Sequence, residues 1–175
     1  MSEKLITKEM ILDTKPCYTP EIEDGQVWTF SSACLDKSFP AHDRLYVLGH
    51  LMTEAQVEKF SAWCLKEAFQ KIPPRIPYEP AMSPRSGLNK PPGGGSSGEP
   101  SDPSYDPLYY LDQIIAWSQS KASGWKKVKS MGMNLALGRV ASFLVSHPEG
   151  RLDLEIEKVW DEVMKSLSEL LNEKN

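Results

Sequence analysis

The side chains with the clearest capacity for chemistry are three histidines, His42, His50 and His147. His42 is followed by Asp43, a dipeptide of the kind that metal phosphohydrolases use, but such a site needs further histidines and a distant aspartate around the metal. His50 would lie on the same helix about two turns later, and His147 stands next to a proline at the expected end of another helix. We interpret His42 and Asp43 as a surface histidine beside a helix-capping aspartate. A metal-dependent hydrolase at these two residues is the less favoured alternative.

Other sequence signatures of catalysis are absent from the chain. It contains no HExxH or P-loop pattern and no pair of CxxC motifs. Its three cysteines, Cys17, Cys34 and Cys64, are widely spaced and odd in number, which favours free buried thiols over disulfides or a metal site. We therefore expect no cofactor and no bound metal, and the sequence gives no support for an enzyme.

Basic side chains are concentrated in one predicted helix. No acid occurs between Lys121 and His147, whereas eight acids and four bases follow between Glu149 and Asn175. Lysines beside a tryptophan can rest on phosphates and stack a base, so this helix predicts a nucleic-acid-binding accessory protein as one alternative. The same bases would equally pair with the acidic last helix inside the fold. The candidate residues are Lys121, Trp125, Lys126, Lys127, Lys129 and Arg139.

The helices that must position these side chains are predicted from apolar spacing and capping residues. Residues 43–69 contain two helical segments, and Thr53 with Gln56 forms a capping box that starts the second helix at Glu54. The proline pair after Ile72 ends it. We expect one apolar surface of this helix to be buried, with Val57, Phe60, Cys64 and Ala68 on it and Ala55, Trp63 and Phe69 beside them.

Three more helices are predicted after residue 105. Asp106 and Pro107 begin the first, which ends near Ser120. The second extends from Ser123 to the residue before Pro148, and two glycines inside it, Gly132 and Gly138, indicate close approach of another backbone rather than a break. Asp153 caps the last helix, which extends to about Asn172. Shorter helices are predicted at 4–13 and 26–35.

Residues 73–105 separate the two helical halves, because prolines and glycines are concentrated there. This composition predicts a flexible insertion, and its PxxP spacing at Arg75, Pro77 and Pro80 suggests a weak peptide ligand for aromatic-lined grooves. The sequence thus predicts an all-α bundle of five or six helices, divided into residues 1–72, the insertion 73–105 and residues 106–175. We expect both halves to share one core, because each alone is small for independent stability.

The segments PCYTP, PAHDRLYVL and FSAWC, which follow one another within residues 10–70, carry a family resemblance. This region resembles the N-terminal helical region of phage and prophage-encoded alanine-rich helical proteins of unassigned function. The resemblance implies a helical fold and a viral or mobile-element origin, but no activity, and it ends after Ile72.

Our leading hypothesis is a non-catalytic helical module that binds another protein, for example a phage-encoded modulator or inhibitor of a host protein complex. The absence of catalytic patterns and the broad apolar stripes favour it. The stripe of the last helix would also allow a second copy of the chain to dock. The chain has no signal region and no apolar run of membrane-spanning length, so we expect a cytoplasmic protein, in the host cytoplasm if viral, with no membrane partner.

Overall fold

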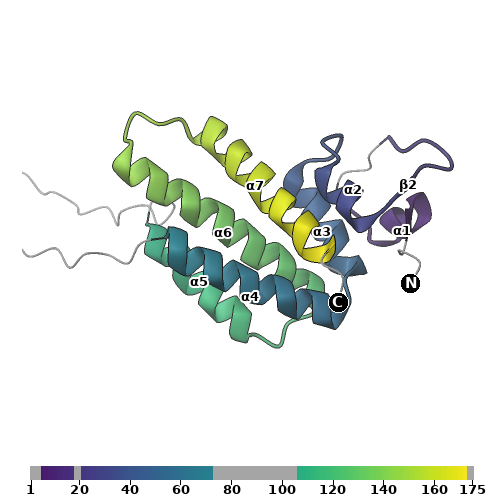
Figure 1. The fold of residues 1–175 in the computed structure, drawn as a ribbon, viewed down its shortest axis with the longest axis horizontal. Helices are drawn as coiled ribbons and strands as arrows, with labels where there is room; N and C mark the ends of the chain where they lie inside the picture. Colours follow the sequence, from purple (N-terminus) through teal and green to yellow (C-terminus); the bar gives the residue numbers. More distant parts are fainter. Residues whose placement is uncertain (1–4, 18–20, 73–105, 173–175) are drawn as a thin grey trace, which may run out of the picture.

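The computed structural model describes residues 5–17, 21–72 and 106–172. These residues form seven helices, one more than the largest number predicted, and the predicted all-α class is confirmed (Figure 1). The predicted insertion, residues 73–105, lies outside the described residues, and Arg75, Pro77 and Pro80 lie outside them as well.

The N-terminal part combines two short helices with one pair of very short strands. β1 (Ile6–Thr7) pairs antiparallel with β2 (Val27–Trp28), so that Ile6 lies opposite Trp28. Because β1 takes the first residues of the predicted helix 4–13, α1 is limited to Lys8–Asp13 and is capped by the Thr7 hydroxyl. In the same way β2 shortens the predicted helix 26–35 to α2 (Phe30–Leu35).

The helical hairpin forms as predicted except at its first cap. α3 (Ala41–Leu51) begins after Pro40, two residues before Asp43, so Asp43 lies inside the first turn and neither it nor His42 is the N-cap. Pro40 is the N-cap residue, with φ −55° and ψ 143°, and no side chain caps this helix. The capping box of Thr53 and Gln56 is confirmed at the start of α4 (Glu54–Lys71). Of the residues expected beside the buried surface, Ala55 and Phe69 are exposed.

Three long helices follow the insertion. α5 (Pro107–Gln119) is capped by Asp106 as predicted, and its side chain accepts a hydrogen bond from the Leu108 N–H at 3.0 Å. α6 (Gly124–Ser146) continues unbroken through both of its internal glycines. α7 (Leu152–Asn172) starts two residues earlier than a cap at Asp153 predicts, so Asp153 lies in its first turn, where it pairs with Arg151 at 2.6 Å.

Side chains from neighbouring segments pack against the backbone of α6 at two of its glycines, Gly132 and Gly138. A Cβ at Gly132 would overlap Leu45 of α3, and one at Gly138 would lie 2.6 Å from Ile72 Cδ1 and 2.9 Å from Tyr110 Cβ. Close packing at both positions is therefore confirmed, but the atoms nearest to these glycines belong to side chains and not, as predicted, to another backbone. Glycine costs about 1 kcal/mol relative to alanine in a helix, and the close packing that its missing side chain allows offsets this cost.

α6 is the centre of the bundle. It packs against α3, α4, α5 and α7, and Figure 1 shows it between α7 on one side and α4 and α5 on the other. The buried apolar residues form one cluster to which segments before and after the insertion contribute. Burying each large aliphatic side chain stabilises the fold by roughly 1.5–3 kcal/mol. The largest fully buried side chains are Ile6, Leu45, Leu48, Phe60, Ile72, Ile114, Met131, Leu135, Met164 and Leu167.

The apolar stripe of α7 is mostly used within this core. Val163 and Leu167 are fully buried, while Ile156, Trp160 and Leu170 pack against the core and stay partly exposed. Within the described residues, none of the helices has the length and hydropathy needed to cross a membrane.

Candidate functional site

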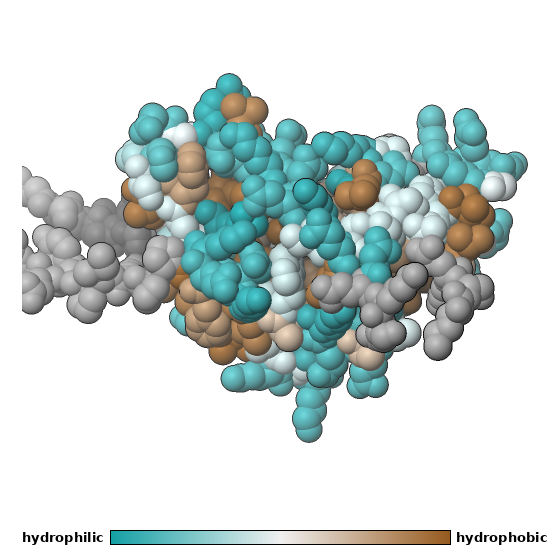
Figure 2. All heavy atoms as spheres, in the orientation of Figure 1, coloured by the Kyte–Doolittle hydropathy of each residue, from teal (hydrophilic) through white to brown (hydrophobic). Residues whose placement is uncertain are grey.

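Exposed apolar side chains gather at one end of the bundle, where α4 ends, α5 begins and α6 turns into α7 (Figure 1). Figure 2 shows hydrophobic residues on the surface at this end. Phe69 and Val145 are the most exposed, at 60% and 66%. Since single exposed apolar residues are common but groups of them are not, the grouping matters more than any one member. We call this group the loop-end surface; its members are Phe69, Tyr109, Val145, Leu152 and Leu154.

The turn between α6 and α7 holds part of this surface in place. The Gly150 N–H donates to the His147 carbonyl oxygen at 2.8 Å. The His147 ring stacks on Phe143, with 4.2 Å between ring centroids and 8° between planes. A Cβ on Gly150 would lie 3.0 Å from Phe143 and 2.9 Å from the His147 oxygen, so a larger residue would disturb the turn. A turn fixed in this way presents its neighbours Val145 and Leu152 with little further loss of conformational entropy on binding.

A groove of about 440 Å³ lies beside the loop-end surface, between α6 and α7. Phe143 and Val159 give it apolar walls, and the Ser142 hydroxyl oxygen is buried there without a hydrogen-bond partner among the described residues. Its edges carry both signs of charge, which suits a polar peptide segment better than a strongly charged ligand. The charged edge consists of Lys71, paired with Glu67, and the ion pairs Arg139–Glu162 and Lys158–Glu155.

The predicted basic residues divide into two groups. Arg139 lies on the α7 side of α6, with its side chain only 12% exposed, and forms an ion pair with Glu162. This is the intramolecular pairing with the acidic last helix that the charge pattern allowed. The second group consists of Lys121, which lies just before α6, and of three lysines in the first two turns of α6, Lys126, Lys127 and Lys129. Within the described residues these four side chains form no ion pair.

Trp125 belongs to an aromatic cluster that joins α6 to α3. Its ring stacks on His50 with 4.7 Å between centroids, and Tyr46 meets it edge-on at 5.1 Å. The Lys126 ammonium lies 5.4 Å from the Trp125 ring centroid, and the Lys129 ammonium lies 5.2 Å from that of Tyr46. Trp125 therefore packs against α3 within the fold and also lies beside the lysines. A base stacked on its ring, as predicted, would compete with the Lys126 ammonium for the same ring.

The three histidines lie in separate environments. The His42 Nε2 is 3.5 Å from a carboxylate oxygen of the buried Asp43. Burial of His50 in the aromatic cluster lowers its pKa, and its Nε2 is buried without a partner in the described part of the chain. His147 lies at the far end of α6 from His50. Among the described residues, no three histidine, cysteine or acidic side chains converge in a way that would hold a metal ion.

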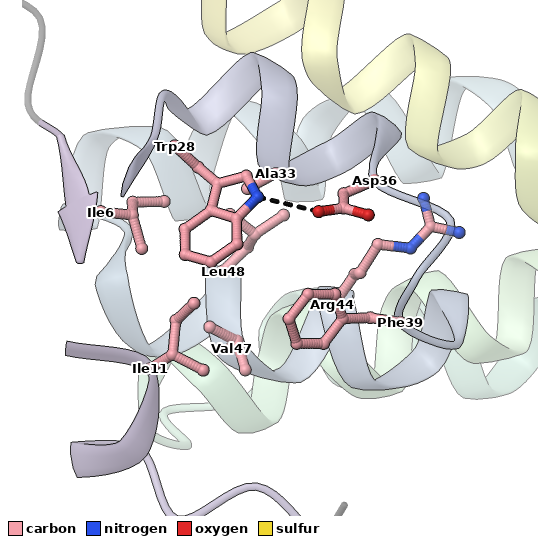
Figure 3. Close-up of a pocket in the computed structure, with 9 residues that line it drawn as sticks. All are labelled: Ile6, Ile11, Trp28, Ala33, Asp36, Phe39, Arg44, Val47 and Leu48. Atoms are coloured by element: carbon pink, nitrogen blue, oxygen red, sulfur yellow. Dashed lines mark hydrogen bonds between the residues drawn. The ribbon is translucent and has the colours of Figure 1, made fainter. Parts of the chain in front are cut away.

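A small apolar pocket separates β2, α2 and α3 (Figure 3). The Trp28 indole N–H donates to Asp36 at 2.8 Å, and the Arg44 guanidinium donates to the Cys34 carbonyl oxygen. Partial burial opposes ionisation of Asp36, but hydrogen bonds from Ser38 and Trp28 outweigh it and lower its pKa. The cavity measures about 20 Å³, far below the size of a ligand pocket, so these contacts fasten the N-terminal elements to the bundle.

The loop-end surface was not predicted from the sequence. Phe69 was expected beside a buried stripe, and Val145 and Leu154 fall between core positions of their helices. The only available signal was their position next to the ends of helices, where fewer neighbours can cover a side chain. No family model, curated protein or solved structure matches the chain.

Proposed function

We propose that this chain is a non-catalytic helical module that binds another protein through the loop-end surface. The observation that supports the proposal is that five of the nine exposed large apolar side chains of the described residues lie at this one end of the bundle. Grouped apolar and aromatic side chains on a fixed frame are the usual anchors of protein interfaces. In line with the sequence resemblance, we propose a phage-encoded modulator or inhibitor of a host protein complex as the specific form of this function.

The magnitude of the apolar contribution indicates how much surface the partner must cover. Complete burial of a large apolar side chain yields roughly 1.5–3 kcal/mol, and about half of each loop-end side chain is already buried. The five side chains together therefore supply about 5 kcal/mol. A micromolar complex requires about 8 kcal/mol after the entropic costs of association. We infer that the partner also enters the groove between α6 and α7, where Phe143 and Val159 form apolar walls.

The test is affinity capture from host extract with the full chain and two variants. The loop-end variant carries Val145→Glu and Leu154→Glu, which places two charges in the surface. The control variant carries Leu12→Glu and Leu35→Glu, two exposed apolar residues on α1 and α2 at the other end of the molecule. Circular dichroism spectra and melting curves establish that all three chains fold.

The proposal expects one stoichiometric protein that the parent and the control retain and the loop-end variant loses. Retention of the same protein by all three chains would exclude the loop-end surface as the contact. Capture of no stoichiometric protein by the parent chain would count against a protein-binding function altogether.

A further inference from the structure

The four lysines at the start of α6 differ from most other cations of the described chain. Lys8, Lys37, Lys71, Lys158, Arg139 and Arg151 each form an ion pair with a carboxylate. Lys121, Lys126, Lys127 and Lys129 form none with the described residues, and the first turn of α6 contains no acid. Like charges this close together repel one another, so their grouping costs stability unless an anion is bound.

Two of these ammonium groups are held in place by aromatic rings. Lys126 lies over Trp125 and Lys129 over Tyr46, at 5.4 Å and 5.2 Å from the ring centroids. The rings are themselves fixed, because Trp125 stacks on His50 and the Tyr46 hydroxyl donates to the Thr14 carbonyl oxygen at 2.9 Å. Lysines restrained in this way lose less rotamer entropy when they bind a ligand than free surface lysines do.

The other two lysines lie on the opposite side of the helix start. Lys121 and Lys127 line a groove of about 560 Å³ between α4 and the turn that precedes α6. Glu54 and Glu58 line the same groove, so its potential is mixed. An anion is therefore attracted mainly to the side of Lys126 and Lys129.

We propose that the patch formed by Lys126 and Lys129 with Tyr46 and Trp125 binds the phosphate backbone of a single-stranded nucleic acid. Ammonium groups supply the phosphate contacts, and a neighbouring base contacts the part of the Tyr46 and Trp125 rings that Lys126 and Lys129 leave exposed. Single-strand binders combine these two features, whereas acidic side chains alone would make no use of the aromatic rings. Arg139 takes no part, because Glu162 neutralises it on another side of α6.

The test measures binding of a fluorescently labelled 20-nucleotide single-stranded DNA and RNA by anisotropy between about 50 and 200 mM salt. Two variants have the same net charge: the patch variant carries Lys126→Glu and Lys129→Glu, and the control carries Lys66→Glu and Lys165→Glu. Lys66 of α4 and Lys165 of α7 are exposed and form no ion pair within the described residues. A neutral variant, Lys126→Gln with Lys129→Gln, serves if the charge reversal prevents folding.

The proposal expects the patch variant to bind at least about tenfold more weakly than the parent, with a salt slope smaller by about 1.4, because each lost phosphate contact contributes about 0.7. The control should keep most of the affinity. Equal losses in both variants, or no binding by the parent at about 50 mM salt, would overturn it. A labelled poly-glutamate peptide that binds the parent as tightly as the oligonucleotides, and loses affinity in the patch variant, would assign the patch to an acidic protein instead.

Discussion

Gly138→Ala is expected to destabilise the fold although alanine is the better helix former. The new Cβ would lie 2.9 Å from Tyr110 Cβ, which is attached directly to the α5 backbone, and 2.6 Å from Ile72 Cδ1, whose side chain is fully buried. Overpacking of this kind costs about 3 kcal/mol at the upper end of its usual range, and the gain in helix propensity returns about 1 kcal/mol. The net loss in unfolding free energy is therefore about 2 kcal/mol, or a fall in Tm of roughly 4–8 °C for a chain of this length.

Urea denaturation followed by circular dichroism measures this loss, and a double-mutant cycle locates its source. Ile72→Val removes the Cδ1 atom that the new Cβ would meet, so Gly138→Ala should cost less in the Ile72→Val background than in the parent chain. Part of the cost should remain, because the contact with Tyr110 is unchanged. An alanine variant that is as stable as the parent would refute the close packing at Gly138, and strictly additive effects of the two substitutions would refute the contact with Ile72.

Two further predictions concern titratable groups. Burial lowers the pKa of His50 below 6.5, so at mildly acidic pH the unfolded chain binds more protons than the folded chain does. The unfolding free energy should therefore decrease from pH 7.5 to pH 5.5. His50→Phe, which keeps a ring beside Trp125, should reduce this decrease in urea titrations; an unchanged pH dependence would contradict it. Burial raises the pKa of the Cys34 thiol to about 12 and that of Cys64 well above its usual value, whereas Cys17 is exposed. A thiol reagent should therefore modify only Cys17 rapidly in the native chain and all three thiols after denaturation, and rapid native reaction of two or more would contradict the burial.

Local signals in the sequence were sufficient where a helix end depends on its own residues. Thr53 with Gln56 defines the start of α4, and Asp106 with Pro107 defines the start of α5, because each cap is made within a few residues of chain. The start of α3 was misplaced because Asp43 resembles a capping residue, whereas Pro40 begins the helix with no side-chain hydrogen bond. A capping residue one turn too late cannot be distinguished from a true cap by spacing alone.

Which apolar side chains are exposed depends on tertiary contacts, and the spacing of apolar residues in the sequence does not predict these contacts. Phe69 lies next to the buried Ala68 in sequence, yet at the end of α4 no other described helix covers it, and it is 60% exposed. Gly138 shows the opposite case, since glycine in a helix already signals close packing, although the sequence does not say that Ile72 and Tyr110 are the partners. For the basic residues, the distribution of charge along the sequence predicted two alternatives, nucleic-acid binding or pairing with the acidic last helix. For Arg139 the structure shows the second, because its side chain forms an ion pair with Glu162.

The two proposed surfaces lie at opposite ends of the same helix, which allows them to be tested separately. Lys126 is in the first turn of α6 and Val145 in its last, and nineteen residues of α-helix between them correspond to about 28 Å. This distance exceeds the Debye length of about 8 Å at physiological salt, so a charge change at one end has little direct electrostatic effect at the other. Reversal of Lys126 and Lys129 should therefore leave capture of a protein partner unchanged. Loss of both activities in that variant would indicate that one ligand spans α6 or that the helix itself has lost its packing, and the melting curve distinguishes these two outcomes.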